Sequence, residues 1–247
     1  MTVEDIDYYP SSISRKRHRS NAWNTEEEEV AADKHNENIN ASKEKDTKKD
    51  KKPHLSESDI SARCFRKGNH IYFYAGVSKD SVYRMQDHLL KINEEFDALK
   101  NKNPTVVVTS TPIILHINSF GGGVFAAFAA IDFIQQSTIP VYTVVEGATA
   151  SAGTLMSIVG KKRFIRPHAS MLIHQLSSWF GGKMTEIDDD YQNVKQMHES
   201  IKQLYITHTR IAGADLEELL KHDLWWKSQK CIENGLVDGL WNEANYL

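Results

Sequence analysis

A run of small residues between two apolar stretches constrains the fold of this chain more than any other feature. Residues 141–145 are β-branched or aromatic and predict a buried strand, whereas residues 154–159 are typical of a buried helix. The junction between them, residues 147–153, holds only Gly, Ala, Thr and one serine, Ser151. A hydroxyl at this junction is open to a substrate carbonyl, and the N–H groups that begin the helix favour negative charge beside it. The junction therefore suits an acyl-transfer nucleophile, although close packing of helix on strand would also explain the small residues.

A glycine turn ends a second predicted strand. Residues 113–117 form an apolar run, residues 118–123 read Asn-Ser-Phe-Gly-Gly-Gly, and an alanine-rich helix is expected over 124–134. The turn lacks the Gly-Lys-Ser/Thr ending of a phosphate loop and the second spaced glycine set of a dinucleotide site. An oxyanion hole or a docking edge for a peptide is the better functional interpretation, and a plain tight turn is the structural one.

The order of the predicted elements favours an α/β fold. A strand over 70–77 and an amphipathic helix over 78–100, with a serine cap, precede the two strands and two helices described above. Strands that alternate with helices predict right-handed crossovers and a largely parallel sheet. The glycine turn and Ser151 then lie at the carboxyl ends of strands, which is the edge where open α/β sheets place their sites.

The C-terminal half adds a histidine and one long helix. His174 ends an apolar strand, where a histidine is either a core residue or a functional group. An apolar stripe over 187–208 predicts a helix that opens at Thr185, with Asp188 completing a capping box. One narrow stripe among many charges indicates a helix that projects and packs on another subunit, or one that lies across its own sheet. Two short helices are expected after it, over 215–221 and 228–234.

The first 60 residues differ in composition from everything after them. They carry 11 basic and 14 acidic residues, so this tail is predicted to be disordered, because it cannot bury enough apolar surface to offset the entropy of ordering. Residues 61–247 predict one folded domain. The net charge of −3 gives no general attraction to nucleic acid or anionic membrane, and the two cysteines give no disulfide framework or metal-ligand spacing. No apolar run reaches the roughly 18 residues of a membrane span, so a soluble cytoplasmic protein is expected.

Five stretches of the chain together resemble one known family. They fall in that family's order, with ungapped spacing from His174 to Gly235, and they are residues 117–122, 147–153, 162–164, 171–175 and 233–238. Over residues 70–241 the chain is similar to the proteolytic subunit of the Clp protease, within the crotonase-like fold group. The resemblance implies an α/β fold of repeated β-β-α units, with a mostly parallel sheet and a projecting long handle helix.

The resemblance also implies a set of site residues. Ser151 would be the nucleophile, His174 the general base, and Asp223 the group that orients His174. The backbone N–H groups of Gly122 and Ala152 would form the oxyanion hole. The substrate peptide would add as a strand beside the glycine turn and the loop after His174, where the resemblance implies contacts with Gly121, Gly123, Val124, Gln175 and Leu176. No metal and no cofactor are implied.

The family's activity and partners follow as further expectations. The resemblance implies a serine endopeptidase that hydrolyses unfolded polypeptides inside a homo-oligomeric, heptameric ring, fed by an ATP-dependent AAA+ unfoldase. Several residues depart from the family's pattern. Phe120 replaces a proline before the glycines, Gly123 adds a third glycine, and His116 replaces a tyrosine that helps to form the unfoldase dock. Lys221 and His222 stand where the family has an acidic and a basic residue that link rings.

Three other functions stay open at this point. A Ser–Lys peptidase of the signal-peptide-peptidase type would use Lys161 or Lys162 as its base. A catalytically inactive ring subunit would have a structural role. An acyl-CoA enzyme of the crotonase type would have no use for the Ser, His and Asp set.

Overall fold

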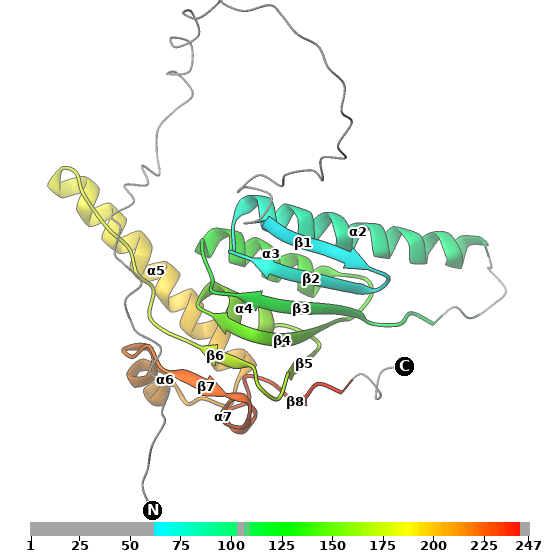
Figure 1. The fold of residues 1–247 in the computed structure, drawn as a ribbon. Helices are drawn as coiled ribbons and strands as arrows, with labels where there is room; N and C mark the ends of the chain where they lie inside the picture. Colours follow the sequence, from blue (N-terminus) through cyan, green and yellow to red (C-terminus); the bar gives the residue numbers. More distant parts are fainter. Residues whose placement is uncertain (1–61, 103–106, 108, 243–247) are drawn as a thin grey trace, which may run out of the picture. The chain divides into compact units, whose positions relative to one another are not determined.

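The computed structural model describes residues 62–102, 107 and 109–242, and Figure 1 shows the strands and helices that they form. The tail predicted to be disordered, residues 1–60, lies outside these described residues. None of the helices that the structure describes combines the length and the apolar composition that a membrane crossing requires.

Eight strands form one mixed, mostly parallel sheet. Its main path runs β1-β2-β3-β4-β5-β8, and β6 pairs with both β4 and β7. Only the β1–β2 and β6–β7 pairs are antiparallel, so the α/β fold with a mostly parallel sheet is confirmed. The strands are β1 (Ala62–Lys67), β2 (His70–Ala75), β3 (Ile113–Ser119), β4 (Val141–Ala150), β5 (Lys162–Ile165), β6 (Ser170–Leu172), β7 (Trp225–Lys227) and β8 (Gly239–Leu240).

Strand β4 changes its neighbour halfway along. Its first half, Tyr142 to Val145, pairs with β5, and its last residues, Ala148 to Ala150, pair with β6. A register shift against β3 lies between the two halves, where Gly147 has φ 58°. A bulge of this kind bends a strand and redirects its pairing. Residues 147–150, which were predicted to belong to the small-residue junction, are therefore part of β4. The strand ends at Ala150, immediately before Ser151.

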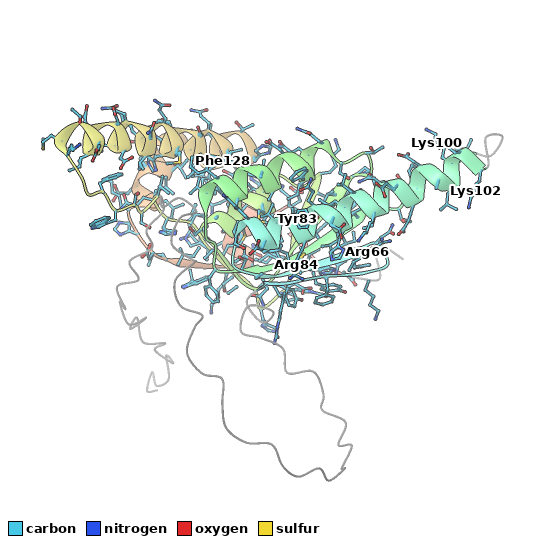
Figure 2. The ribbon with its side chains drawn as sticks, turned by 90° about the horizontal axis from the view of Figure 1, so that it is seen from above. Arg66, Tyr83, Arg84, Lys100, Lys102 and Phe128 are labelled. Atoms are coloured by element: carbon cyan, nitrogen blue, oxygen red, sulfur yellow. The ribbon has the colours of Figure 1, made fainter. Side chains whose placement is uncertain are left out.

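Helices cover one face of the sheet. The helices are α2 (Lys79–Lys102), α3 (Val124–Gln136), α4 (Ala152–Ile158), α5 (Met184–His208), α6 (Gly213–Leu220) and α7 (Ser228–Glu233). Seen from above, α2, α3 and α5 lie on the same side of the strands (Figure 2). Alternate residues of β3 point to opposite faces, so Ile113, Leu115 and Ile117 join the main core under the helices, while Ile114 joins a second cluster with Phe164 and Trp241 on the other face.

The long helix α5 projects from the sheet (Figure 1), as the resemblance implied. Its buried residues, Ile201 and Tyr205, both lie in its C-terminal half. The helix begins at Met184, one residue before the predicted start at Thr185. Its cap also differs from the prediction, because the Lys183 N–H donates to the Glu186 carboxylate rather than to Asp188.

Candidate active site

Ser151 lies at a sharp turn between β4 and α4. Its backbone has φ 54° and ψ −129°, and it is the one non-glycine residue with positive φ in the part of the chain that the structure describes. Such a conformation costs about 1–3 kcal/mol and persists where the surrounding structure enforces it. Here the Ser151 N–H donates to the Leu172 carbonyl at 3.0 Å, and the Ser151 carbonyl accepts from the N–H and the hydroxyl of Thr154. The turn therefore holds the serine side chain at the carboxyl end of β4.

The glycine turn packs directly against Ser151. A Cβ placed on Gly121 would lie 2.6 Å from the Ser151 Cβ and 2.9 Å from the Ala152 nitrogen, so only glycine fits there. Val77 holds the other side of the turn, since its N–H donates to the Gly121 carbonyl and its carbonyl accepts from the Gly123 N–H, both at 2.8 Å. Gly122 lies between these two bonded glycines in a parallel bridge with Val77, so its N–H points to the edge of the turn that faces away from Val77.

Two amide donors remain without an acceptor beside the serine. Among the hydrogen bonds of the described residues, neither the Gly122 N–H nor the Ala152 N–H has a partner. Unpaired amides are rare in folded chains, because an amide away from water costs free energy unless it is bonded. Two of them at one junction form a ready site for a developing negative charge on a carbonyl oxygen.

His174 and Asp223 are brought together by the β6–β7 ladder. Leu172 pairs with Trp225 in this antiparallel pair, so continuing the register by two residues sets His174 opposite Asp223. The Gln175 N–H also donates to the Leu220 carbonyl at 2.7 Å, which ties the loop after His174 to the end of α6. His174 Nδ1 lies 3.6 Å from Asp223 Oδ1. The Asp223 side chain is 77% exposed, and within the described residues no hydrogen bond joins the pair.

The three predicted catalytic side chains therefore share one edge of the sheet. Leu172 pairs with Ala150, so Ser151 and His174 follow neighbouring strand ends. No hydrogen bond joins Ser151 to His174 in the described part of the chain. Catalytic hydrogen bonds are often long in a free enzyme and shorten when substrate binds. The missing hydrogen bond between Ser151 and His174 is therefore compatible with a triad.

The predicted substrate contacts differ in what they can offer. Both polar backbone groups of Gly121 and Gly123 are already bonded within the chain, as is the Gln175 N–H. Leu176 is partly buried against the core, and so is Val124. Gly122, between Gly121 and Gly123, has its N–H on the edge that faces away from Val77, so a peptide strand can add beside it.

Lys161 and Lys162 lie far from the serine. Lys162 pairs with Tyr142 at the beginning of β4, and the Lys161 N–H donates to the Val141 carbonyl. Nine residues along β4 separate Tyr142 from Ser151, which is roughly 30 Å of extended strand at about 3.3 Å per residue, less the shortening at the bulge. Neither lysine can act as the base for Ser151 within one chain, so the Ser–Lys alternative that rests on them is wrong.

A second polar cluster lies further back on β4. The Glu146 carboxylate accepts a hydrogen bond from the Tyr74 hydroxyl, lies 2.9 Å from His116 Nδ1, and accepts from Arg166 Nε at 2.9 Å. Burial raises the pKa of Glu146, but the hydrogen bonds from His116, Tyr74 and Arg166 outweigh it and lower the pKa to about 2. The sequence interpretation missed this cluster, because its members come from three strands and the turn after β5.

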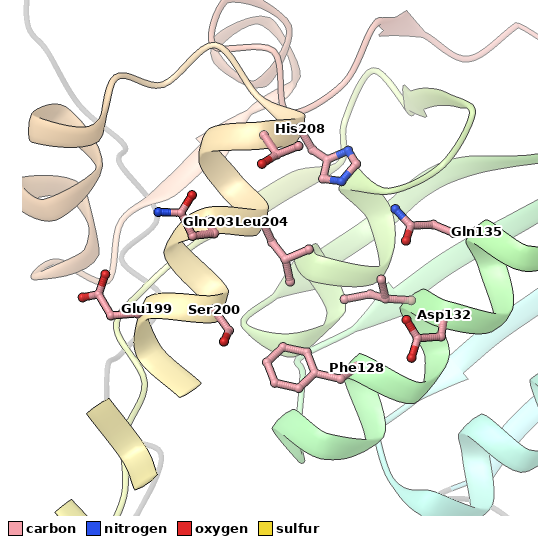
Figure 3. A pocket seen from close by; sticks show the side chains of 10 residues that line it. Phe128, Asp132, Gln135, Glu199, Ser200, Gln203, Leu204 and His208 are labelled. Carbon is pink, nitrogen blue, oxygen red and sulfur yellow. The ribbon is translucent and has the colours of Figure 1, made fainter. Parts of the chain in front are cut away.

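A groove lies elsewhere, between α3 and α5. It has a volume of about 600 Å³, and side chains of the two helices face each other across it (Figure 3). It contains none of the predicted site residues, so the candidate active site is an open strand edge rather than this cavity. Within the described residues no three His, Cys, Asp or Glu side chains are grouped to hold a metal ion.

The mixed sheet, the serine turn and the projecting helix define the class of protein as an α/β protein of the crotonase-like fold. The sequence model of the Clp protease family matches residues 77–244. The chain belongs to the Clp protease family, which is a family of serine peptidases.

Curated relatives agree with this family. The chain is 34% identical over 133 residues to the ATP-dependent Clp protease proteolytic subunit 1 of Chlamydia muridarum, covering 52% of this chain and 69% of the relative. It is 35% identical over 140 residues to the ATP-dependent Clp protease proteolytic subunit 2 of Cutibacterium acnes, covering 55% of this chain and 65% of the relative.

Proposed function

We propose that this chain is a serine endopeptidase in which Ser151 is the nucleophile. The observation that carries the proposal is the strained turn at Ser151 beside the unpaired amides of Gly122 and Ala152. An attacking hydroxyl and two donors for the oxyanion are the parts that peptide hydrolysis by an acyl-enzyme requires. Each such donor is typically worth about 2.7–4 kcal/mol of transition-state stabilisation.

His174 and Asp223 complete the proposed mechanism. Because His174 Nδ1 faces Asp223, its Nε2 is the nitrogen that takes the Ser151 proton as the hydroxyl attacks the peptide carbonyl. Asp223 orients the ring and stabilises the imidazolium. His174 then gives the proton to the leaving amine, and water, deprotonated by the same nitrogen, hydrolyses the acyl-enzyme. The peptide binds as a strand at the free edge of Gly122, near Gly121, Gly123, Val124, Gln175 and Leu176.

The proposal extends to assembly and partners. The relatives are named as proteolytic subunits of ATP-dependent proteases, which supports a cytoplasmic peptidase fed with unfolded polypeptides by an AAA+ unfoldase. The N-terminal half of α5 carries exposed Met184 and Tyr191, which supports packing of this helix against another subunit of a heptameric ring. Residues 61–247 form the peptidase domain in this proposal, and residues 1–60 lie outside that domain.

The direct test is labelling and hydrolysis by size-fractionated full-length protein. Wild-type chain is expected to react with a fluorophosphonate and to cleave a short fluorogenic peptide, while Ser151→Ala loses both. Ser200→Ala is the matched control, since that hydroxyl lies on exposed α5 and bonds only to the Gln196 carbonyl. An assembled ring that neither labels nor cleaves would instead support a structural subunit.

A further inference from the structure

An aromatic pair lies beside the glycine turn, at the beginning of β7. Phe120 immediately precedes Gly121, and its ring meets the ring of Trp225 edge-on, with centroids 6.0 Å apart and planes at 85°. Both rings are exposed, Phe120 by 70% and Trp225 by 45%, and neighbouring Leu224 is also exposed. Exposed apolar surface gathered at one spot marks a place where another apolar group binds.

Both rings are fixed close to Ser151 by the backbone. Gly121 contacts the serine turn so closely that an added Cβ would overlap the Ser151 Cβ, so Phe120 is one residue away from that contact. Trp225 pairs with Leu172, whose carbonyl accepts the Ser151 N–H. Neighbouring strands lie about 4.8 Å apart, so Trp225 is two strands, roughly 10 Å, from Ala150 at the end of β4, and its ring meets that of Phe120 beside the glycine turn.

We propose that Phe120 and Trp225 form an apolar wall that binds the side chain of the substrate residue just after the scissile bond. This inference rests on the proposed peptidase function and adds a substrate preference to it, namely for large aliphatic or aromatic side chains at that position.

The side of the scissile bond follows from the positions of the proposed groups. A peptide strand on the acyl side would run along the free edge that begins at Gly122 and continues toward α3. The leaving amine must be near His174, which protonates it, and therefore near Asp223. Trp225 follows Asp223 by two residues, and Phe120 precedes Gly121 along the chain, whereas the free edge begins after it at Gly122. The wall therefore belongs to the leaving-group side.

The hydrolysis test uses internally quenched peptides that differ only in the residue after the scissile bond, which is Phe, Leu, Ala or Asp. In full-length protein, Phe120→Ala and Trp225→Ala are expected to lower kcat/KM for the Phe and Leu peptides about tenfold and to change it less than about twofold for the Ala and Asp peptides. The matched control is Tyr83→Ala, an exposed aromatic residue on α2 (Figure 2), which should change none of the four. Equal losses on all four peptides, or no loss, would overturn the inference.

A binding test keeps this inference separate from the proposed function. Fluorescence anisotropy on the Ser151→Ala chain, with the same four peptide sequences carrying one fluorophore and no quencher, should give tighter binding of the Phe and Leu peptides, and Phe120→Ala should remove that preference. If the wild-type protein hydrolyses none of the peptides, yet the binding preference for the Phe and Leu peptides is present, the proposed function fails and the wall stands. If hydrolysis occurs without any preference, the wall alone is refuted.

Discussion

Two polar clusters along β4 use the same residue types in opposite ways. At Glu146, one partly buried carboxylate is bonded by Tyr74, His116 and Arg166. At the end of the strand, the Asp223 carboxylate is largely exposed and lies 3.6 Å from His174 with no hydrogen bond between them. The first cluster has little hydrogen-bonding capacity left, whereas the second has groups free for a substrate.

In this fold, one carboxylate cluster stabilises the sheet and a different one is available for chemistry. A partly buried carboxylate that lost one partner would have its charge less well compensated, so the Glu146 cluster contributes to the stability of the sheet. An exposed pair contributes little to stability and can move as bonds are made and broken. A histidine next to a carboxylate is therefore not enough to identify a catalytic site. The unpaired amides beside Ser151 are a more specific indication.

The largest expected effect is on catalysis at the exposed cluster. His174→Ala should lower kcat for a fluorogenic peptide by at least about 10³-fold, because Ser151 would lose its general base. Its unfolding midpoint in urea should match that of the wild type. A variant that keeps its activity would remove His174 from the mechanism.

The buried cluster should respond in the opposite way. Glu146→Ala is expected to lower the free energy of unfolding by about 3 kcal/mol, because His116 and Arg166 lose their common partner. Asp87→Ala is the control, since among the described residues that carboxylate, 39% exposed, pairs with Lys91 and His88 on its own helix, and the urea midpoint should stay unchanged. A Glu146→Ala protein as stable as the wild type would contradict the contrast between the clusters.

The contribution of the Glu146 cluster to the free energy of unfolding should decrease at acid pH. The pKa of Glu146 falls from an ordinary 4.5 to about 2 in the folded chain, so the unfolded chain binds the proton more tightly. Its contribution to stability is therefore fully present above pH 4.5 and is lost as the pH falls toward 2. Urea midpoints measured between pH 2 and 6 should fall less steeply for Glu146→Gln than for wild type. Parallel curves would show that another carboxylate dominates acid unfolding.

The smallest of these effects is expected at Asp223. Asp223→Asn should lower kcat by about 10- to 100-fold, less than the roughly 10⁴-fold typical of a buried triad aspartate. The physical reason is its exposure and its long contact with His174. A loss as large as that of His174→Ala, measured on the assembled protein, would mean that assembly closes this contact.

Local patterns were enough to predict much of the fold. The glycine turn, α3 and the beginning of β4 lie where the apolar runs and glycines indicate, and the structure brings Ser151, His174 and Asp223 to one edge of the sheet. Their catalytic roles stay predictions. The residues of the site came from a resemblance, since spacing alone could not bring His174 to Ser151.

The rest depended on contacts between distant segments. Strand β1 was missed because half of its residues are basic, although Gly68-Asn69 between two extended runs is a hairpin signal. The second half of β4 was assigned to the junction, because small residues carry no periodicity and their strand form depends on pairing with β6. The bridge from Val77 to the glycine turn has no local signal.

The change of neighbour along β4 splits the sheet into two branches. One branch runs through β5 to β8 and ends near Trp241, and the other runs through β6 to β7 and leads to His174 and Asp223. No strand pairing among the described residues links the two branches except through β4 itself. A substitution on the Trp241 branch can therefore reshape that surface of the molecule without moving the edge at which peptide bonds would be cut.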